Sequence, residues 1–225
     1  VQLYCDFSGY SDMAIAVARL LGFELPRNFS FPYFASSPVE FWRRWHISLS
    51  TWIRDYIYIP LGGNRGPAWF NVRNLMIAMV LGGLWHGAAW TFLAWGGMHG
   101  ALLSVNAWWH RSRPSWAPSL PPALGMMLMF AFWNFSMIFF RAETLTDAVT
   151  LVGGLFGGGA MSIDEMQVLW LLPLGLAHWL SYRGIFSNWI REIPDWLYAL
   201  GYAVIAVHAL AFVPMKQRPF LYFQF

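Results

Sequence analysis

Charged residues are scarce in this chain, and their scarcity excludes most soluble folds. Asp, Glu, Lys and Arg make up 11% of the 225 residues, whereas hydrophobic residues make up 58% and aromatic residues 19%. Soluble domains usually carry about 25% charged residues. Four segments lack charge entirely, and each approaches or exceeds the roughly 17 to 25 residues that a membrane-spanning helix needs: residues 74–110, 114–140, 166–182 and 196–215. The sequence therefore predicts a membrane protein.

Cysteine is nearly absent too, and several site classes are excluded with it. Cys5 stands alone, so the chain can form neither an internal disulfide nor a cysteine-based metal cluster. No His-Glu-x-x-His or similar spacing occurs, and no phosphate-loop lysine follows the glycines of 153–159. We therefore expect no bound metal or cofactor. The net charge of only +3 leaves no basic surface for nucleic acid.

The remaining sequence predicts an all-α helix bundle in lipid. No hydrophilic block is long enough to fold separately, so we expect one membrane domain over residues 1–225. Residues 2–22 read as a helix. The uncharged segment 74–110 suits either one tilted helix with a tail or two short helices that meet near Gly96-Gly97.

A strong helix-start signal lies at Ser37-Pro38-Val39-Glu40. Ser at the N-cap, Pro at the first helical position and Glu three residues after the cap form a capping box. We expect one helix from Pro38 to about Ile59, ended by Pro60 and the glycines that follow. One of its faces carries an aromatic stripe, which suits a helix at the membrane interface: Phe41, Trp45, Trp52 and Tyr56.

His86 is the first candidate for chemistry because it lies within the uncharged segment 74–110. An ionisable group inside a membrane segment indicates a functional site, and imidazole exchanges protons near neutral pH. Glycines on both sides remove side chains, so that a ligand or helix can approach closely: Gly82, Gly83 and Gly87. We interpret His86 as a general base, against the alternative of a neutral structural histidine.

His46 is the second candidate, on the predicted interfacial helix. His46 and Ser50 are four residues apart and can hydrogen-bond on one helix. The neighbouring Arg43 and Arg44 could hold an anionic donor. From spacing alone, His46 is equally suited to a site and to an anchor at the membrane interface.

Several runs of residues resemble a known family. The sequence is similar to the membrane-bound O-acyltransferases at residues 6–13 (DFSGYSDM), 41–52 (FWRRWHISLSTW), 54–56 (RDY), 59–65 (IPLGGNR) and 82–87 (GGLWHG). Residues 140–143 (FRAE) and 220–225 (FLYFQF) resemble the alginate O-acetyltransferase branch in particular.

The resemblance implies a fold and a set of roles. The family fold is a funnel of many membrane helices with re-entrant pieces. The histidine of the Trp-His-Gly motif is the family's catalytic residue, which corresponds to His86. The histidine of the Trp-His-x-Ser segment lines the same tunnel, which corresponds to His46. Because the family's preceding helices are absent, we expect this chain to be the C-terminal, catalytic portion of a longer protein.

The implied activity is transfer of an acetyl group from a cytoplasmic thioester such as acetyl-CoA toward an exported polysaccharide, at the bacterial inner membrane. Expected partners are membrane lipids, periplasmic acetyl-transfer proteins and the polysaccharide acceptor. His86 would act as base and His46 as an orienter or second proton carrier. Arg43 or Arg44 would hold the donor's phosphates, and three weaker candidates would position groups: Ser50, Asp55 and Asn74.

Two alternatives stay open. The same motifs suit teichoic-acid D-alanylation and the acetylation of peptidoglycan or cellulose. A proton-coupled transporter is a different class, in which His86 would relay protons along a conduction path.

Overall fold

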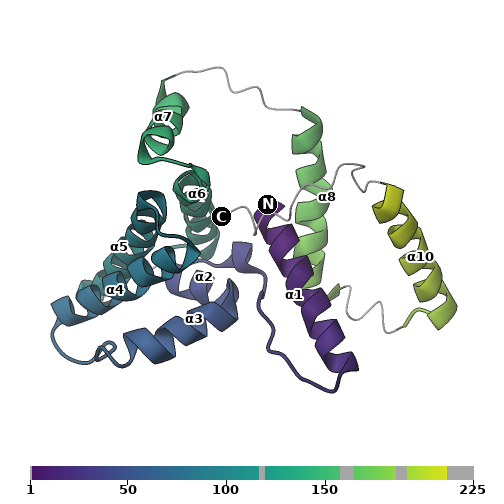
Figure 1. The fold of residues 1–225 in the computed structure, drawn as a ribbon, viewed down its shortest axis with the longest axis horizontal. Coiled ribbons are helices and arrows are strands. Elements are labelled where there is room, and N and C mark those ends of the chain that lie inside the picture. Colours follow the sequence, from purple (N-terminus) through teal and green to yellow (C-terminus); the bar gives the residue numbers. More distant parts are fainter. Residues whose placement is uncertain (1, 117–119, 158–164, 186–191, 212–225) are drawn as a thin grey trace. The chain divides into compact units, whose positions relative to one another are not determined.

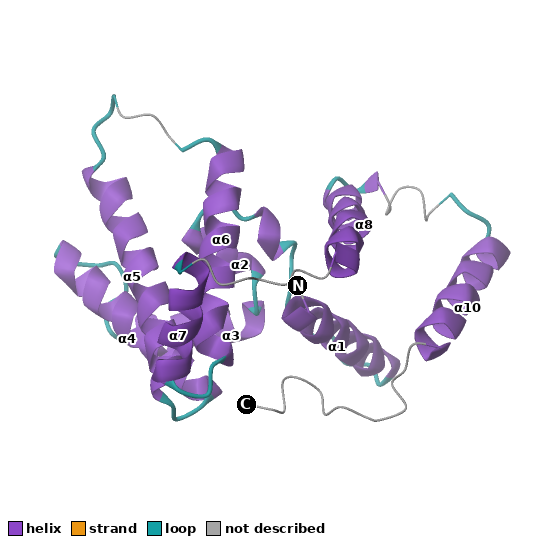
Figure 2. Ribbon diagram, turned by 90° about the horizontal axis from the view of Figure 1, so that it is seen from above, coloured by secondary structure: helices purple, strands orange, loops and turns teal. Residues whose placement is uncertain are grey.

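The structure is a computed structural model, and it describes residues 2–116, 120–157, 165–185 and 192–211 (Figure 1). Within these residues every regular element is a helix and no strand occurs (Figure 2). The prediction of an all-helical fold is confirmed.

The chain divides into two compact units, residues 1–159 and 160–224. The second unit contains α8 (Glu165–Tyr182) and α10 (Asp195–Ala211). All the candidate site residues lie in the first unit. The expectation of a single membrane domain over residues 1–225 stays a prediction.

The first unit begins with α1 (Gln2–Leu20), which ends two residues before the predicted boundary. A loop and the short 3₁₀ helix η1 (Pro32–Phe34) follow. Aromatic rings join α1 to this region: the ring centroids of Phe7 and Phe29 lie 5.0 Å apart, and Phe29 lies 5.0 Å from Trp45. These rings hold the loop beside α1.

The expected helix from Pro38 to Ile59 is interrupted. The structure has α2 (Pro38–Arg44), then α3 (Ile47–Ile53), which continues into a π-helical turn, η2 (Arg54–Tyr58). The break falls at His46, whose backbone is left-handed with φ 43°. A non-glycine residue in this region cannot continue a right-handed helix. The prediction of one continuous helix is therefore wrong.

The start of α2 is confirmed, with a change in its cap. The Ser37 hydroxyl accepts a hydrogen bond from the Glu40 amide at 3.2 Å, as an N-cap does. The Glu40 carboxylate, however, accepts from the amide and hydroxyl of Ser36, at 2.7 and 2.9 Å. The reciprocal half of the capping box thus reaches one residue further back than predicted.

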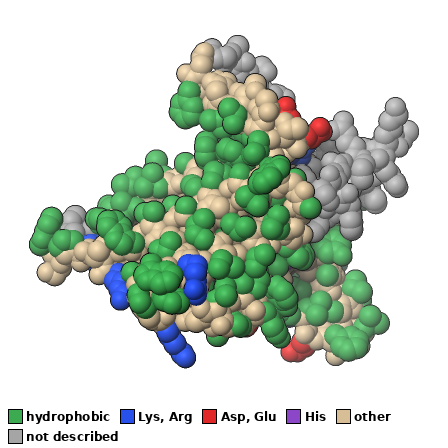
Figure 3. All heavy atoms as spheres, turned by 60° about the vertical axis from the view of Figure 1, so that its left-hand side comes forward, with side chains coloured by type: hydrophobic (Ala, Val, Ile, Leu, Met, Phe, Trp, Pro, Cys, Tyr) green, Lys and Arg blue, Asp and Glu red, His purple; other side chains and the backbone are tan. Residues whose placement is uncertain are grey.

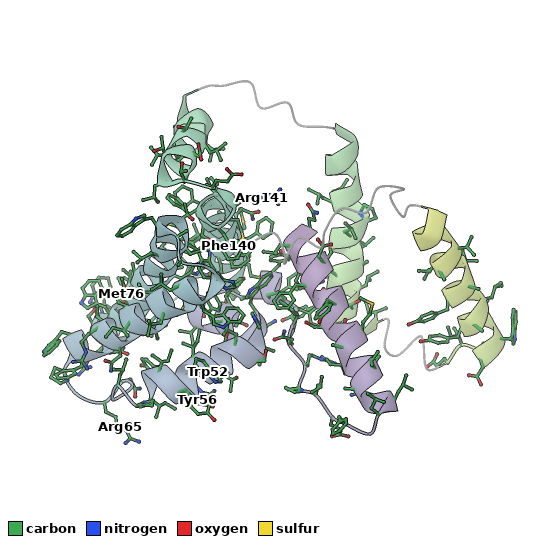
Figure 4. All side chains as sticks on the ribbon, in the orientation of Figure 1. Trp52, Tyr56, Arg65, Met76, Phe140 and Arg141 are labelled. Carbon is green, nitrogen blue, oxygen red and sulfur yellow. The ribbon has the colours of Figure 1, made fainter. Side chains whose placement is uncertain are left out.

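The expected aromatic stripe is divided by the break. Phe41 and Trp45 are buried, at 1% and 5% exposure. Trp52 and Tyr56 stay exposed on α3 and η2, where their rings stack with centroids 5.5 Å apart (Figure 4). The interfacial placement of this region stays a prediction.

The uncharged segment 74–110 forms two helices. They are α4 (Ala68–His86) and α5 (Trp90–Ser112), which lie side by side (Figures 1 and 2). The turn between them lies at 87–89, and Gly96-Gly97 is inside α5, so the expected junction there is wrong. Gly96 has another use: a Cβ on it would collide with the Met79 carbonyl of α4. The absence of a side chain at Gly96 thus allows the two helices to pack closely.

The helix α6 (Pro122–Arg141) is followed by α7 (Leu145–Phe156). Among the described helices, α6 alone is long and apolar enough to cross a membrane by length and composition. Hydrophobic side chains are spread over the whole face shown in Figure 3, among polar side chains and backbone, whereas Lys and Arg occur at a few places. The other three expected spans stay predictions.

Candidate functional site

His46 occupies the break between α2 and α3. Its side chain is buried, at 8% exposure, and its ring meets Phe7 of α1 edge to face with centroids 4.7 Å apart. The Nδ1 atom lies 3.2 Å from Oδ1 of Asn28. The Nε2 atom is buried without a hydrogen-bond partner in the described part of the chain. A buried polar atom without a partner calls for an explanation.

The expected hydrogen bond between the His46 and Ser50 side chains is absent from the described contacts. Ser50 instead donates its hydroxyl to the Trp45 carbonyl at 3.1 Å. His46 is the N-cap of α3 and its backbone is left-handed, so its side chain does not project along the helix face as that of a residue inside the helix would.

His86 is the last residue of α4 and is half-buried. Three aromatic rings surround it with centroids 4.9 to 5.4 Å away: Trp85, Trp95 of α5 and Phe140 at the end of α6. Figure 4 shows Phe140 where α6 meets the α4 and α5 pair. A partly exposed imidazole with apolar walls is accessible to a ligand and yet shielded from bulk water.

The structure brings the two candidate histidines together. The ring of Trp85 lies 6.2 Å from that of His46 and 5.0 Å from that of His86. Burial, and to a smaller extent the nearby His86, lowers the pKa of His46 to about 4. Because burial disfavours the charged form of a histidine, His46 is a neutral imidazole at physiological pH.

A third histidine, His99 of α5, is linked to His86 through the ring of Trp95, which contacts both. It is 1% exposed, and Nε2 lies 3.1 Å from the Ser136 hydroxyl. That hydroxyl donates to the Trp133 carbonyl at 2.8 Å, so it accepts from His99. The His99 ring lies 4.8 Å from that of Trp95, which also contacts His86.

The indole N–H groups of Trp42 and Trp95 are buried beside His99. Neither has a hydrogen-bond acceptor among the described residues, and Nδ1 of His99 has no donor there. Together with Ser136 of α6, these side chains of α2 and α5 form a cluster from three helices. Sequence spacing alone does not reveal such a cluster.

The arginine candidates differ from each other. Arg44 forms an ion pair with Glu40 at 2.6 Å and donates to the Phe31 carbonyl at 3.4 Å. Arg43 is exposed. Of the two, Arg43 has the more accessible guanidinium.

The weaker candidates make local contacts. Asp55 binds the adjacent Arg54 through two hydrogen bonds of 2.7 and 3.1 Å. Asn74 is fully buried, accepts from Arg73 at 2.9 Å and donates to the Gly63 carbonyl at 2.9 Å. Asn74 therefore stabilises the Gly62-Gly63 turn, where φ is positive at both residues.

No group of three or more His, Cys, Asp or Glu side chains in the described ranges is arranged to hold a metal ion. The site offers neutral imidazoles, indole N–H donors and apolar walls. These groups suit proton transfer to and from a substrate in a shielded pocket.

Comparisons with known proteins identify the family of the chain. The family model described as the membrane-bound O-acyltransferase family matches residues 1–145. A probable alginate O-acetylase of Azotobacter vinelandii is 46% identical over 176 residues, covering 78% of this chain and 35% of the relative.

Two further relatives extend the comparison. A probable alginate O-acetylase of Pseudomonas putida is 38% identical over all of this chain and 51% of its own length. A peptidoglycan O-acetyltransferase of Helicobacter pylori is 43% identical over 74% of this chain and 32% of its own length. The chain thus spans between about a third and a half of the length of these relatives.

Proposed function

We propose that this chain, which belongs to the membrane-bound O-acyltransferase family, transfers an acetyl group from a cytoplasmic donor toward an exported polysaccharide. The names of its relatives support this substrate class, since they describe acetylation of alginate and of peptidoglycan. Both acceptors are glycans with free hydroxyl groups.

The chemistry requires one proton acceptor at the reacting hydroxyl. An acceptor oxygen attacks the carbonyl carbon of the acyl thioester, so that a C–O bond forms and the C–S bond breaks. We assign His86 as the base that takes the hydroxyl proton, which the leaving thiolate receives afterwards. The indole N–H of Trp95, whose ring contacts that of His86, would stabilise the negative charge that develops on the carbonyl oxygen.

The observation that carries this assignment is the contrast between two neighbouring histidines. His86 is half-buried and reachable, whereas His46 is buried beside Trp85. We assign His46 as the orienter or second proton carrier of the same site.

The donor and the surroundings are part of the proposal. Acetyl-CoA or another acyl thioester would approach from the cytoplasm, with Arg43 as a candidate for its phosphates. The protein would cross the bacterial inner membrane several times and deliver acetyl groups with periplasmic partner proteins.

Replacing His86 tests the function. In a strain whose exported polymer depends on the full-length protein, His86→Ala should lower the rate of polymer acetylation roughly 10²- to 10⁴-fold, because a positioned base is lost. The measurement is the acetyl content of the polymer, normalised to the amount of tagged protein in the membrane.

The matched control is His110→Ala, because His110 is exposed near the end of α5. It should leave acetylation unchanged. Normal acetylation in His86→Ala would contradict the assignment. Proton-coupled solute uptake by vesicles, without acetyl transfer, would favour the transporter alternative.

A further inference from the structure

Asn28 makes an unusual number of contacts around His46. Its side-chain Oδ1 lies 3.2 Å from Nδ1 of His46 and accepts from the amide and the hydroxyl of Ser48, at 3.2 and 3.0 Å. Its Nδ2 donates to the Ser11 hydroxyl of α1 at 3.3 Å. One amide side chain thus links α1, the loop before α2, and the start of α3.

These contacts determine which Asn28 atom faces His46. A backbone amide can only donate, so the atom that faces the Ser48 amide must be the carbonyl oxygen. The opposite orientation would place two donors against each other. The oxygen therefore also faces the imidazole.

The oxygen in turn determines the tautomer of His46. Because Oδ1 of Asn28 can only accept, the facing Nδ1 must carry the hydrogen. In the neutral ring, Nε2 then has the lone pair. This is the atom that is buried without a partner among the described residues.

The backbone of Asn28 supports the same arrangement. Its carbonyl accepts from the Ile47 amide at 2.9 Å, and the nearby Ser30 amide donates to the Arg44 carbonyl at 2.9 Å. These bonds lie on both sides of His46, whose left-handed backbone has φ 43°. Such a conformation costs free energy and persists where the surroundings hold it.

We propose that Asn28 is a positioning residue of the acyl-transfer site, which holds His46 as the Nδ1–H tautomer so that Nε2 is its proton-accepting nitrogen. The proposal rests on the proposed function for its role in catalysis. Its structural half concerns the tautomer alone and can be tested separately.

The surroundings of His46 make a pH profile informative. Among the described residues, the titratable group that acts on the His46 ring is His86, across Trp85. The other described neighbours of the ring include Phe7, Asn28 and Ser48, which are uncharged. A carboxylate at position 28 would thus be a new charge beside this imidazole.

The first test compares Asn28→Asp with Asn28→Leu in the full-length protein. Asp keeps the accepting oxygen and adds a negative charge, which raises the pKa of His46. The variant should stay active, and the acid limb of its pH–activity profile should move to higher pH. Leu removes the acceptor and should lower activity roughly 10- to 100-fold, as loss of an orienting partner does.

The control is Asn71→Leu, which removes a similar hydrogen bond, to the Tyr58 hydroxyl at 2.6 Å. It should keep the wild-type profile. If Asn28→Leu is poorly produced, the pH–activity profile of Asn28→Asp tests the proposal by itself. Wild-type activity in Asn28→Leu, or an unmoved acid limb in Asn28→Asp, would overturn the proposal.

The second test needs no activity. In ¹⁵N-histidine-labelled protein, His46→Gln identifies the His46 resonances by their disappearance. The wild type should show a protonated Nδ1 and an unprotonated Nε2, and Asn28→Leu should change that pattern. A protonated Nε2 in the wild type would overturn the tautomer whatever the activity. If His86→Ala keeps normal acetylation while the His46 tautomer is as expected, the result would count against the proposed function and not against the tautomer.

Discussion

At the scale of single residues, three histidines differ in burial and in their neighbours. His86 is half-buried at the end of a helix, His46 is buried at a strained turn, and His99 is enclosed between α5 and α6. Only a reachable imidazole can act on a substrate, whereas an enclosed one can orient its neighbours or pass on a proton. The same residue type therefore serves different roles within a few ångströms.

The low pKa of His46 predicts a pH-dependent stability. The folded-state value is about 4, below the value of about 6.5 for a free histidine. The neutral ring thus contributes stability fully above pH 6.5, and this contribution is lost as pH falls from 6.5 through 4. Between pH 7 and pH 5 the loss is about 2 kcal/mol.

Thermal unfolding of purified full-length protein checks this. Wild type should lose more stability than His46→Gln when the pH is lowered from 7 to 5. His110→Ala, which removes an exposed histidine, should behave as the wild type. Equal pH dependence in the wild type and His46→Gln would show that His46 is not buried in its neutral form.

Sequence alone led to His86 and His46, because a histidine in an apolar or amphipathic segment needs a reason. It did not lead to Asn28, which lies in an ordinary loop and acts on a residue 18 positions away. Nor could it show that the side chain of Asp55 bonds to Arg54 and that of Asn74 to the Gly63 carbonyl. Such choices depend on neighbours that only the fold supplies.

At the scale of elements, helix starts were easier to predict than helix breaks. Ser37 and Pro38 mark the start of α2 through local chemistry, which is readable in four residues. The break at His46 has no such local mark, since neither Gly nor Pro is present there. It is held by backbone bonds to Asn28 and Ser30, and long-range contacts of this kind override helix propensity.

Close helix approach predicts the effect of added methyl groups. A Cβ on Gly83 would collide with the Phe92 carbonyl of α5. Gly83→Ala should therefore separate α4 and α5, at a cost of about 1 to 3 kcal/mol, and should lower the unfolding temperature of the full-length protein.

Gly97→Ala is the matched control. It lies in α5 and meets nothing within 4 Å, so it should be neutral or slightly stabilising, because alanine favours helix over glycine. Equal unfolding temperatures for Gly83→Ala and Gly97→Ala would contradict the described approach of the two helices.

At the scale of the whole molecule, the site and the family match fall in the first unit. Residues 1–159 hold every candidate side chain, and the family match covers residues 1–145. Exposed apolar side chains are frequent on α1, α6 and α10, as expected for helices that contact lipid or further helices.

Transfer of a labelled acyl group would show whether the protein is an acyltransferase that depends on His86. Membrane vesicles containing the full-length protein would receive an acetyl thioester labelled in its acetyl group, together with a polysaccharide acceptor. We expect the label to move to the acceptor, and His86→Ala to slow the transfer roughly 10²- to 10⁴-fold at equal protein amount. Transfer at the wild-type rate in His86→Ala would contradict it.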